Sequence, residues 1–337
     1  MFDIIENYKT GDKMRTFGEW EKQELIFLAL PHKNSDWAEY LDEILDYYVN
    51  LVKIIAKYQK VVLISPNKKD FEKYFKDVKN VEFYEIDTND TWIRDYGAID
   101  VLKGDKIVAN DFKFNAWGGK FQSQKDNEVN DKLFKNFSGK VVKHNLVLEG
   151  GSIDFNGNGI MLTTQKCLLN ENRTNGLTKD DFNKIFKDIF GIKDVIWLKN
   201  GFIKGDDTDN HVDTLARFID EQTIAYSSCE DKEDEHYNEL KKMENELKQT
   251  KFNLISLPIP KPIFYDDVRL PATYANFVFV NGALIVPTYG DKNDEIVLDR
   301  LKKALPNHDV VGVDSRVLIR QNGSIHCSTQ NRFFGKR

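Results

Sequence analysis

Residues 24–30 read Glu-Leu-Ile-Phe-Leu-Ala-Leu, an apolar run that ends at Pro31. A short, nearly continuous apolar run bounded by a proline is typical of a buried strand. A helical pattern follows from Asp36, a candidate N-cap, to about Lys60, and the apolar run 61–65 comes directly after it. We therefore expect a strand, a helix and a second strand in this part of the chain.

The same order of elements recurs along the sequence. After a shorter helix near residues 69–78 and a strand at 81–84, further helical patterns begin near residues 126, 178, 234 and 292. Each is followed by a strand and then by two strand-like runs around a turn. This spacing of roughly 50 to 60 residues indicates about five repeated supersecondary units and argues against a single doubly wound sheet.

Composition excludes several classes of protein. The 337 residues are 41% apolar and 12% aromatic, which is enough for a packed core. The net charge of -6 argues against a nucleic-acid partner. No apolar run approaches the roughly 20 residues of a membrane helix, and the N-terminal residues lack the pattern of a signal peptide. We expect a cytoplasmic protein with a loose lead-in at residues 1–18 and a single domain at residues 19–337.

Cys327 is the strongest candidate for a reactive group. The chain has three cysteines without CxxC spacing, so we expect neither a disulfide framework nor a cysteine-rich zinc site. A free cysteine is most often an ordinary buried thiol. Cys327 instead lies in the polar run 323–330, at the end of a strand-like segment, and we predict that it is a nucleophile. His326 should point to the opposite side of that strand, so we do not expect it to be the partner of Cys327.

Residues 205–215 place several acids around one histidine. His211 and Asp213 are two residues apart and would share one face of a strand. A carboxylate beside an imidazole raises the imidazole pKa and orients the ring, as a general acid/base requires. The run lacks the ligand spacing of a calcium loop, and no second histidine is placed to complete a zinc site. We therefore predict an acid/base pair and no metal.

A third polar run, residues 89–97, directly follows a strand, and such loops commonly carry functional sites. If residues 92–94 are extended, Trp92 and Arg94 share one side, while Asp95 lies where the chain turns toward Gly97. We predict a structural ion pair for Arg94. For Asp95 we favour a role in the site.

Taken together, these residues resemble the agmatine deiminase group of the guanidine-modifying (pentein) enzymes, which is related to bacterial peptidylarginine deiminases. Seven short motifs in the family's order carry the resemblance over nearly the whole chain: Glu19-Trp20 and residues 89–97, 115–120, 149–152, 168–173, 205–213 and 323–330. The resemblance implies an α/β fold, namely a five-bladed pseudosymmetric propeller of ββαβ-type repeats with the site in its central channel.

The resemblance also implies roles for single residues. Cys327 matches the nucleophile, His211 the general acid/base, and Asp95 and Asp213 the carboxylates that grip a guanidinium. Trp92 and Asp207 match positions that contact the rest of the substrate. Three further residues match loops of the site to which we assign no direct role: Glu149, Gly150 and Gly323.

The implied reaction is hydrolysis of agmatine to N-carbamoylputrescine and ammonia through a thiouronium on the cysteine. Two carboxylates can hold a planar guanidinium bidentately, and the cationic substrate favours the thiolate. We expect no metal or organic cofactor, and a homo-oligomer is one assembly that the resemblance allows.

Three alternatives stay open: deimination of free or peptide-linked arginine, amidino transfer to an amine acceptor, and a non-catalytic protein of the same architecture. The four matched catalytic positions argue against the last. The sequence departs from the family pattern at Asn210, Asn322 and Ser324, where glycine is common. Asparagine tolerates left-handed backbone angles, so we expect the loop geometry to survive at the two asparagines.

Overall fold

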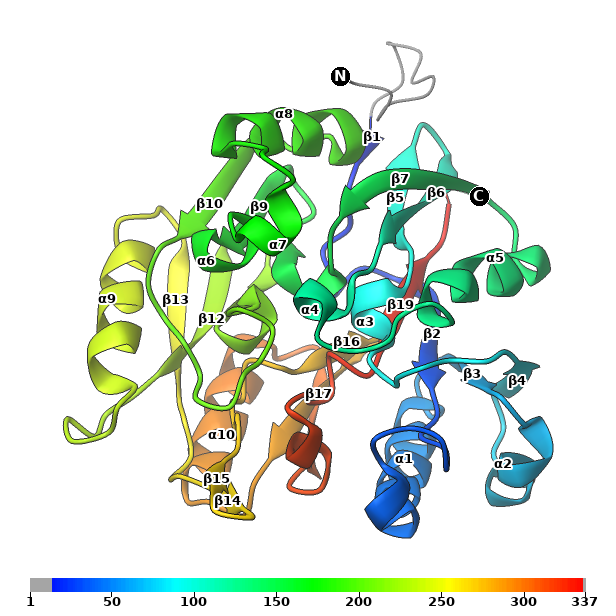
Figure 1. The fold of residues 1–337 in the computed structure, drawn as a ribbon. Helices are drawn as coiled ribbons and strands as arrows, with labels where there is room; N and C mark the ends of the chain where they lie inside the picture. The colour runs from blue at the N-terminus through cyan, green and yellow to red at the C-terminus, as the bar shows by residue number, and fades with distance from the viewer. Residues whose placement is uncertain (1–13, 336–337) are drawn as a thin grey trace.

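The computed structural model describes residues 14–335 and has an α/β architecture of repeated units (Figure 1). Five of its sheets contain three or four strands each. In every one of them a strand pairs antiparallel with one neighbour and parallel with another, as expected for a ββαβ repeat. A parallel pair needs a crossover connection, and each crossover here contains a helix.

One sheet joins the two ends of the described chain. Its order is β19-β2-β3-β4, so the last strand pairs with the first long one. Phe27 lies opposite Val62 of the parallel neighbour and opposite Gln330 of the antiparallel one. The elements of this unit are β2 (Gln23–Ala29), α1 (Leu41–Ile55), β3 (Lys60–Ser65), α2 (Lys68–Phe75), β4 (Val81–Glu85) and β19 (Gln330–Phe333).

The other four units follow in chain order. The second holds β1 (Met14–Arg15), β5 (Ile99–Lys103), β6 (Lys106–Lys113), α5 (Val129–Leu133) and β7 (Lys140–Val147). The third holds β8 (Ile153–Phe155), β9 (Ile160–Thr164), α6 (Gln165–Leu168), α7 (Glu171–Thr174), α8 (Lys179–Phe190) and β10 (Asp194–Leu198). The fourth holds β11 (Ala216–Asp220), β12 (Thr223–Ser228), α9 (Tyr237–Leu247) and β13 (Asn253–Pro258). The fifth holds β16 (Val278–Val280), β17 (Ala283–Thr288), α10 (Asn293–Ala304) and β18 (Asp309–Asp314).

Short elements connect these units. The hairpin β14 (Phe264–Tyr265) and β15 (Val268–Arg269) precedes the fifth unit, and the single turns α3 (Ile93–Tyr96) and α4 (Ala116–Gly119) lie near the middle of Figure 1. The 3-10 turns are η1 (Ala38–Tyr40), η2 (Asp126–Glu128), η3 (Phe134–Asn136), η4 (Gly150–Ser152), η5 (Val212–Thr214) and η6 (Leu318–Gln321).

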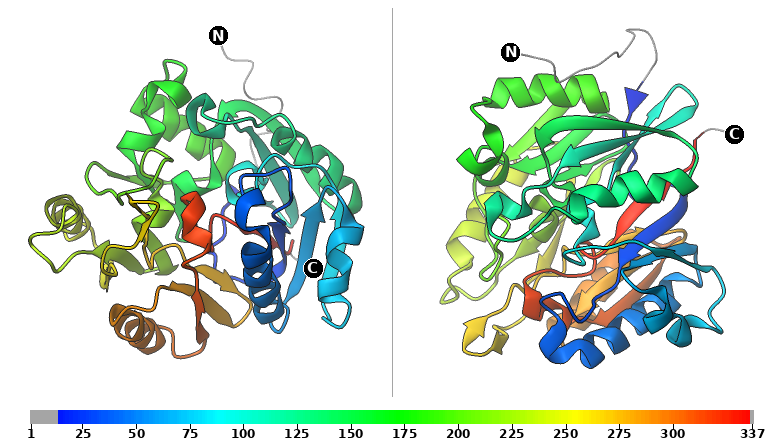
Figure 2. Two further views of the ribbon diagram at one scale, coloured as in Figure 1. Left: turned by 60° about the horizontal axis from the view of Figure 1, so that its bottom comes forward. Right: turned by 45° about the vertical axis from the view of Figure 1, so that its right-hand side comes forward.

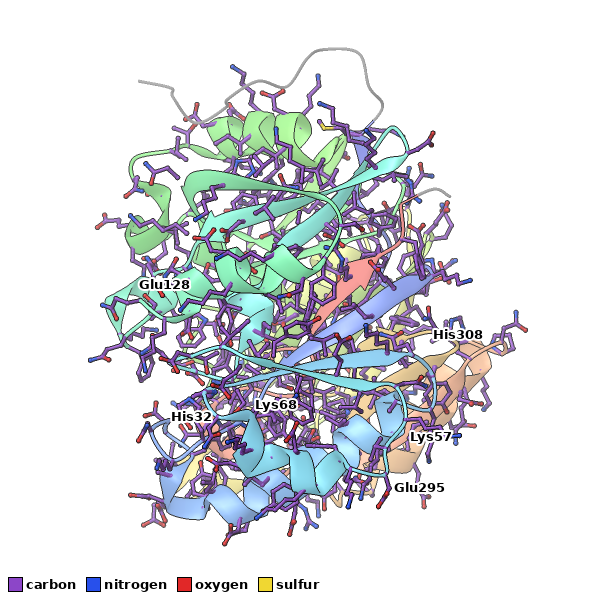
Figure 3. The ribbon with its side chains drawn as sticks, turned by 90° about the vertical axis from the view of Figure 1, so that its right-hand side faces the viewer. His32, Lys57, Lys68, Glu128, Glu295 and His308 are labelled. Carbon is purple, nitrogen blue, oxygen red and sulfur yellow. The ribbon has the colours of Figure 1, made fainter. Side chains whose placement is uncertain are left out.

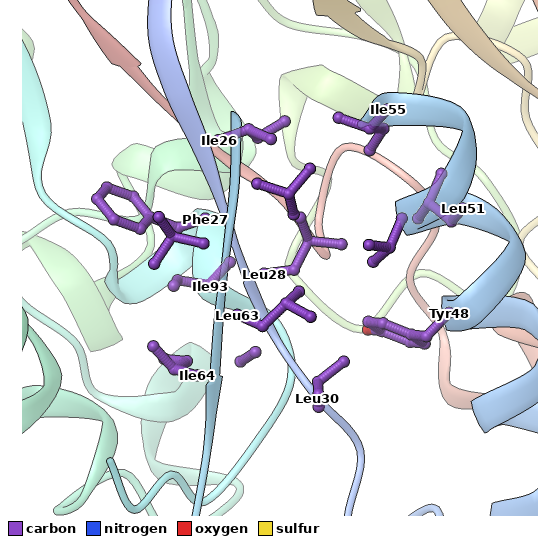
Figure 4. Packing of buried hydrophobic residues seen from close by; sticks show 14 of the residues in the cluster. Ile26, Phe27, Leu28, Leu30, Tyr48, Leu51, Ile55, Leu63, Ile64 and Ile93 are labelled. Atoms are coloured by element: carbon purple, nitrogen blue, oxygen red, sulfur yellow. The ribbon is translucent and has the colours of Figure 1, made fainter. Parts of the chain in front are cut away.

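Helix α1 covers one face of the sheet that holds β2 and β3. In Figure 4, Leu51 and Ile55 of the helix face Leu28 of the sheet, whereas Phe27 and Ile64 point to the other face. All five side chains are buried. Both faces of these strands are therefore covered, which explains why their sequences are continuous apolar runs.

In the left view of Figure 2, helices α9 and α10 lie at the rim of the molecule. Charged side chains cover the outer side of the helical layer, as Figure 3 shows for Lys57 and Glu295. Within residues 14–335, no helix has the length and apolar character needed to cross a membrane.

Most predicted elements are present, with shifted ends. Asp36 is not the cap of the first helix. Turns and η1 lie between Asp36 and α1, which begins at Leu41. Thr178 caps α8 through a capping box with Asp181. Residues 1–13 of the predicted lead-in lie outside the described residues. Met14 and Arg15 also belong to the predicted lead-in, and they form β1, which pairs with β5.

Candidate active site

Cys327 lies in a turn before β19 and not at the end of a strand. The amide of Ser328 donates to Ser324 O at 3.2 Å, and the amide of Thr329 donates to His326 O at 3.1 Å. The strand prediction for this segment is therefore wrong. Because the backbone is turned, the alternation of side chains in a strand does not apply to His326 and Cys327.

The Cys327 thiol is buried beside polar groups. Asn276 Nδ2 lies 3.3 Å from Sγ, and Asp213 Oδ2 lies 3.7 Å from it. Asn276 Oδ1 also accepts from the backbone amides of His326 and Cys327. Burial, followed by the charges of Asp213 and Asp95, raises the pKa of the Cys327 thiol well above its usual value. Burial and these carboxylates thus favour the protonated thiol over the thiolate.

Asp95 is presented by the single helical turn α3. Residues 92–94 are not all extended, because α3 begins at Ile93 and the amide of Gly97 donates to Ile93 O at 2.7 Å, which closes the turn. Trp117 Nε1 donates to Asp95 Oδ2 at 2.9 Å, and the amide of Gly151 donates to Asp95 Oδ1 at 2.9 Å. Burial raises the pKa of the Asp95 carboxyl. Its orientation is thus set by two donors.

His211 directly precedes the 3-10 turn η5 and does not lie on a strand, which corrects the predicted conformation. Its nearest carboxylate is Asp95, whose Oδ1 lies 3.7 Å from Nδ1, whereas Asp213 pairs with His326. Neither ring nitrogen of His211 has a hydrogen-bond partner among residues 14–335. Burial opposes protonation of the ring, but Asp95, Cys167 and Glu149 together raise the pKa of His211 well above its usual value.

Gly151 marks the point where three predicted site residues meet. A Cβ atom there would lie 2.6 Å from His211 Nδ1, 2.9 Å from Asp95 Oδ1 and 3.0 Å from Asp213 Oδ2. At the preceding Gly150, a Cβ atom would collide with Arg94 O. Only glycine fits at such contacts, so this loop lets the three side chains approach one another.

Glu149 belongs to the same loop and is fully buried. Arg173 Nε lies 2.9 Å from each of its carboxylate oxygens. Donor atoms of Glu149, Cys167 and His211 lie within 4.8 Å of one another, a spacing that could hold a metal ion. The Arg173 guanidinium already binds both oxygens of Glu149, so it competes with a cation for this carboxylate.

The front pocket opens above Cys327 and has an empty volume of about 460 Å³. Five acids, including Asp207, line it, and none of its lining residues that the structure describes is a lysine, arginine or histidine. Burial raises the pKa of Asp207 to about 6 and that of Asp90 to about 8. The full lining is Asp36, Asp90, Trp92, Asp95, Trp117, Phe121, Asp206, Asp207, Thr208, Thr214, Gln321, Asn322, Gly323 and Cys327.

The two asparagines that replace family glycines adopt left-handed backbone angles, with φ of 69° at Asn210 and 64° at Asn322. The expected conformation is therefore kept at both positions. Gly323 packs beneath the pocket, where a Cβ atom would lie 2.5 Å from the Trp92 ring. Glycine is required at Gly323 by this close approach.

A rear cavity lies behind these residues and shares no lining residue with the front pocket. Arg94 and His326 line the rear cavity, while the adjacent Asp95 and Cys327 line the front pocket. Arg94 donates from Nη2 to Asn331 Oδ1 at 2.6 Å and lies 3.5 Å from Glu19 Oε2. Its predicted role as a structural ion pair is confirmed.

Sequence reasoning missed several residues of the site. Trp117 and Glu19 lie in motifs that carried the resemblance, but no role was assigned to either. Asn276 lies outside every motif, in a stretch without a recognisable pattern, and only the fold brings it to Cys327. The wrong strand geometry also excluded His326 from the site.

Comparison with known proteins agrees with this geometry. The chain is 59% identical to an agmatine deiminase of C. jejuni, a cysteine-to-serine variant solved with substrate bound, with a TM-score of 0.96 over 99% of this chain and 100% of that one. It is 28% identical to an agmatine deiminase of Enterococcus faecalis, with a TM-score of 0.87 over 95% and 96%. An agmatine deiminase of Medicago truncatula is 30% identical over 97% of this chain and 98% of its own length.

A family model provides the broader assignment. The model described as Porphyromonas-type peptidyl-arginine deiminase matches residues 15–332, which is nearly the whole chain. The resemblance found in the sequence is therefore confirmed. The chain belongs to the Porphyromonas-type peptidyl-arginine deiminase family.

Proposed function

We propose that this protein is an agmatine deiminase, which hydrolyses agmatine to N-carbamoylputrescine and ammonia. One observation carries the choice of substrate: the front pocket is lined by five acids and, among the described residues, by no basic side chain. Agmatine is cationic at both ends, whereas arginine carries a carboxylate beside its amine. A pocket lined by acids attracts both ends of agmatine, whereas it repels the carboxylate of arginine. The agmatine deiminase relatives support the same choice.

The guanidinium end binds next to Cys327. Asp95 and Asp213 are both fully or almost fully buried, and each has an oxygen near the position of Gly151. Two carboxylates can accept from the planar set of guanidinium N–H groups and so fix the central carbon against Sγ. The bound cation also offsets the two charges that keep the thiol protonated, so the thiol releases its proton to solvent as the substrate binds and becomes a thiolate. The substrate thus activates its own nucleophile.

The first half of the reaction breaks a C–N bond. Cys327 Sγ attacks the guanidinium carbon and forms a C–S bond. His211, protonated under the influence of Asp95, donates its proton to the departing nitrogen, and ammonia leaves. A thiouronium remains on Cys327.

The second half releases the product. His211 is now neutral and accepts a proton from a water molecule that attacks the thiouronium carbon. The C–S bond then breaks as the hydroxyl proton of the adduct passes to Sγ, which restores the thiol, and N-carbamoylputrescine leaves. The positive charge of the substrate lessens the need for an oxyanion hole, because the reacting centre gains no net negative charge.

The distal half of the substrate lies along the mouth of the pocket. Trp92 provides an aromatic face for a cation, and Asp207 provides a carboxylate. Lys120 Nζ contacts the backbone oxygen of Asp207. The side chain of Asp207 can therefore face the distal amine while its backbone is held by a neighbouring loop.

We extend the proposal to the architecture. The five ββαβ sheets would be the blades of one propeller, with residues 19–337 as a single catalytic domain. The shared topology of the sheets supports this. A cytoplasmic location and a homo-oligomeric assembly stay predictions.

The test compares ammonia release from agmatine, free arginine and an arginine-containing peptide at equal concentrations. We expect the highest kcat/KM for agmatine. Higher turnover of arginine or of the peptide would overturn the choice of substrate. Cys327→Ala should abolish release from agmatine, and mass spectrometry of the quenched wild-type protein should find the adduct on Cys327.

Cys229→Ser is the matched control, because Cys229 is half-buried and does not line the front pocket. It should keep the activity of the wild-type protein. If Cys327→Ala keeps its activity as well, the covalent mechanism is wrong.

A further inference from the structure

His326 is held between two carboxylates. Its Nδ1 lies 2.8 Å from Asp213 Oδ2, and its Nε2 lies 2.8 Å from Glu19 Oε2. The side chain is 2% exposed. Ionised carboxylates can only accept hydrogen bonds, so the geometry places a hydrogen on both ring nitrogens. Two charge-assisted hydrogen bonds then fix the ring on both sides.

The surroundings of Glu19 and Asp213 favour the ionised form of both carboxylates. Burial opposes ionisation of Glu19, but Arg217 and His326 outweigh it and hold the pKa of Glu19 well below its usual range. Burial also opposes ionisation of Asp213, but the hydrogen bond from His326 and the charges of His326, His211 and Arg217 lower that pKa. Neither carboxylate is therefore a donor to the ring.

Glu19 is itself anchored firmly. Its Oε2 lies 3.0 Å from Arg217 Nη2 and 3.5 Å from Arg94 Nη2, and its Oε1 accepts from the amide of Phe279 at 2.8 Å. Arg94 Nε also donates to the backbone oxygen of His326 at 3.3 Å. The rear end of the His326 ring is thus tied to three separate parts of the fold.

The front end of this chain of contacts reaches the guanidinium site. Asp213 is fully buried, and its Oδ2 lies near both His326 and Cys327 Sγ. Its other oxygen, Oδ1, has no hydrogen-bond partner among residues 14–335. A buried carboxylate oxygen without a partner is costly unless a ligand supplies one. One oxygen of Asp213 is held from behind, and the other is left for a substrate N–H.

We propose that His326 is a positioning residue that clamps Asp213 through Nδ1 and is itself anchored by Glu19 through Nε2, so that Asp213 Oδ1 faces the guanidinium. This inference rests on the proposed deiminase function. His326 touches no substrate atom and acts through Asp213. The clamp also explains why a histidine adjacent to the nucleophile faces the rear cavity.

Two amide substitutions separate the ends of the clamp. In His326→Asn the amide nitrogen takes the place of Nδ1 and can still donate to Asp213. In His326→Gln it takes the place of Nε2, so the donor to Glu19 is kept and the donor to Asp213 is lost. We expect His326→Gln to raise KM for agmatine by roughly tenfold or more, because a buried charged acceptor loses its donor. We expect kcat to fall less, and His326→Asn to restore most of the KM.

Equal KM values in the two variants would overturn the clamp. If either variant fails to fold, Glu19→Gln decides, because it keeps the shape of the side chain and removes the charge that anchors Nε2. We expect Glu19→Gln to raise KM. An unchanged KM in this variant would contradict the anchoring by Glu19 and with it the proposal.

A measurement without substrate separates this proposal from the function it rests on. In protein labelled with nitrogen-15 at histidine, the signal that disappears in the His326 variants should show a hydrogen bound to each ring nitrogen, as the two hydrogen bonds to carboxylates require. A ring with one unprotonated nitrogen would overturn the clamp even if agmatine is hydrolysed. Absence of ammonia release by the wild-type protein would instead refute the proposed function, whatever the state of the ring.

Discussion

The two sides of the site treat buried charge in opposite ways. On the front side, Asp90, Asp95 and Asp207 line a pocket without a basic lining residue among those described, and burial raises the pKa of all three. On the rear side, Glu19 is surrounded by guanidinium and imidazole groups, and its pKa is lowered. The front pocket thus has more acidic than basic side chains, whereas the negative charge of Glu19 at the rear is compensated by basic side chains of the protein itself.

This difference in charge compensation suggests that the front carboxylates serve ligand binding, whereas the rear ones serve the stability of the fold. A buried carboxylate without a cation is unfavourable in the free protein and becomes favourable when a cationic ligand arrives. A carboxylate with both oxygens already bound by protein donors, as in Glu19, contributes to the folded structure and is unavailable to a ligand. Front substitutions should therefore affect activity more than stability, and rear substitutions that break pairs should do the reverse.

The largest effect is expected for Asp95→Asn on the front side. Loss of a buried charged partner of the guanidinium should lower kcat/KM for agmatine by roughly a thousandfold. The free energy of unfolding should change less than in rear-side substitutions, because Asp95 has one basic neighbour, His211 at 3.7 Å, whereas Glu19 has three. Asp111→Asn is the matched control, since Asp111 is a buried acid outside the front pocket, and it should leave kcat/KM little changed. A marked loss of stability in Asp95→Asn would break the contrast.

On the rear side, Arg217→Met should destabilise the fold. Arg217 is fully buried, donates to Asp154 Oδ1 at 2.6 Å and lies 3.0 Å from Glu19 Oε2. Breaking a buried pair leaves its carboxylates uncompensated and costs roughly 3 kcal/mol or more. Urea unfolding measures this loss.

The control for the rear substitution is Arg316→Met, which removes an exposed pair with Asp314. An exposed ion pair contributes less than about 1 kcal/mol to stability. The midpoint of urea unfolding should therefore hardly differ between Arg316→Met and the wild-type protein. Similar losses in the two arginine variants would show that the rear charges matter no more than surface charges do.

The smallest effect is expected at the mouth of the front pocket, and it depends on pH. Burial raises the pKa of Asp207 to about 6, so its carboxylate is charged above that pH and neutral below it. KM for agmatine should therefore rise as the pH falls through about 6. Asp207→Asn should raise KM by about tenfold at pH 8 and flatten its dependence on pH near 6. An identical pH dependence in wild type and variant would exclude Asp207 as the residue that titrates.

Much of the fold could be predicted from the sequence because its units are local. The runs 24–30 and 61–65 are apolar on both faces, and the helical pattern between them has one apolar face. The capping residue Thr178 marks the start of α8 without reference to the rest of the chain. The spacing of the helices indicated the repeat. No signal in the sequence predicted the turns that delay the start of α1 until Leu41.

The site itself could be predicted only in part. The sequence alone predicted which residues would carry the chemistry, because Cys327, His211, Asp95 and Asp213 have reactive side chains in polar runs. It placed Cys327, His211 and Asp213 on strands, whereas each of them lies in or beside a turn, and it placed Asp95 at a turn, where the structure has the single helical turn α3. The assumed alternation paired His211 with Asp213 and turned His326 away from the site.

The tertiary structure alone decided which of these groups meet. His211 lies closest to Asp95, Asp213 to His326, and Asn276 to Cys327, in each case across a long distance in sequence. Charge compensation depends on distances through space, which a linear sequence does not contain. For this reason the excess of acid at the front and its compensation at the rear become visible only in the folded chain.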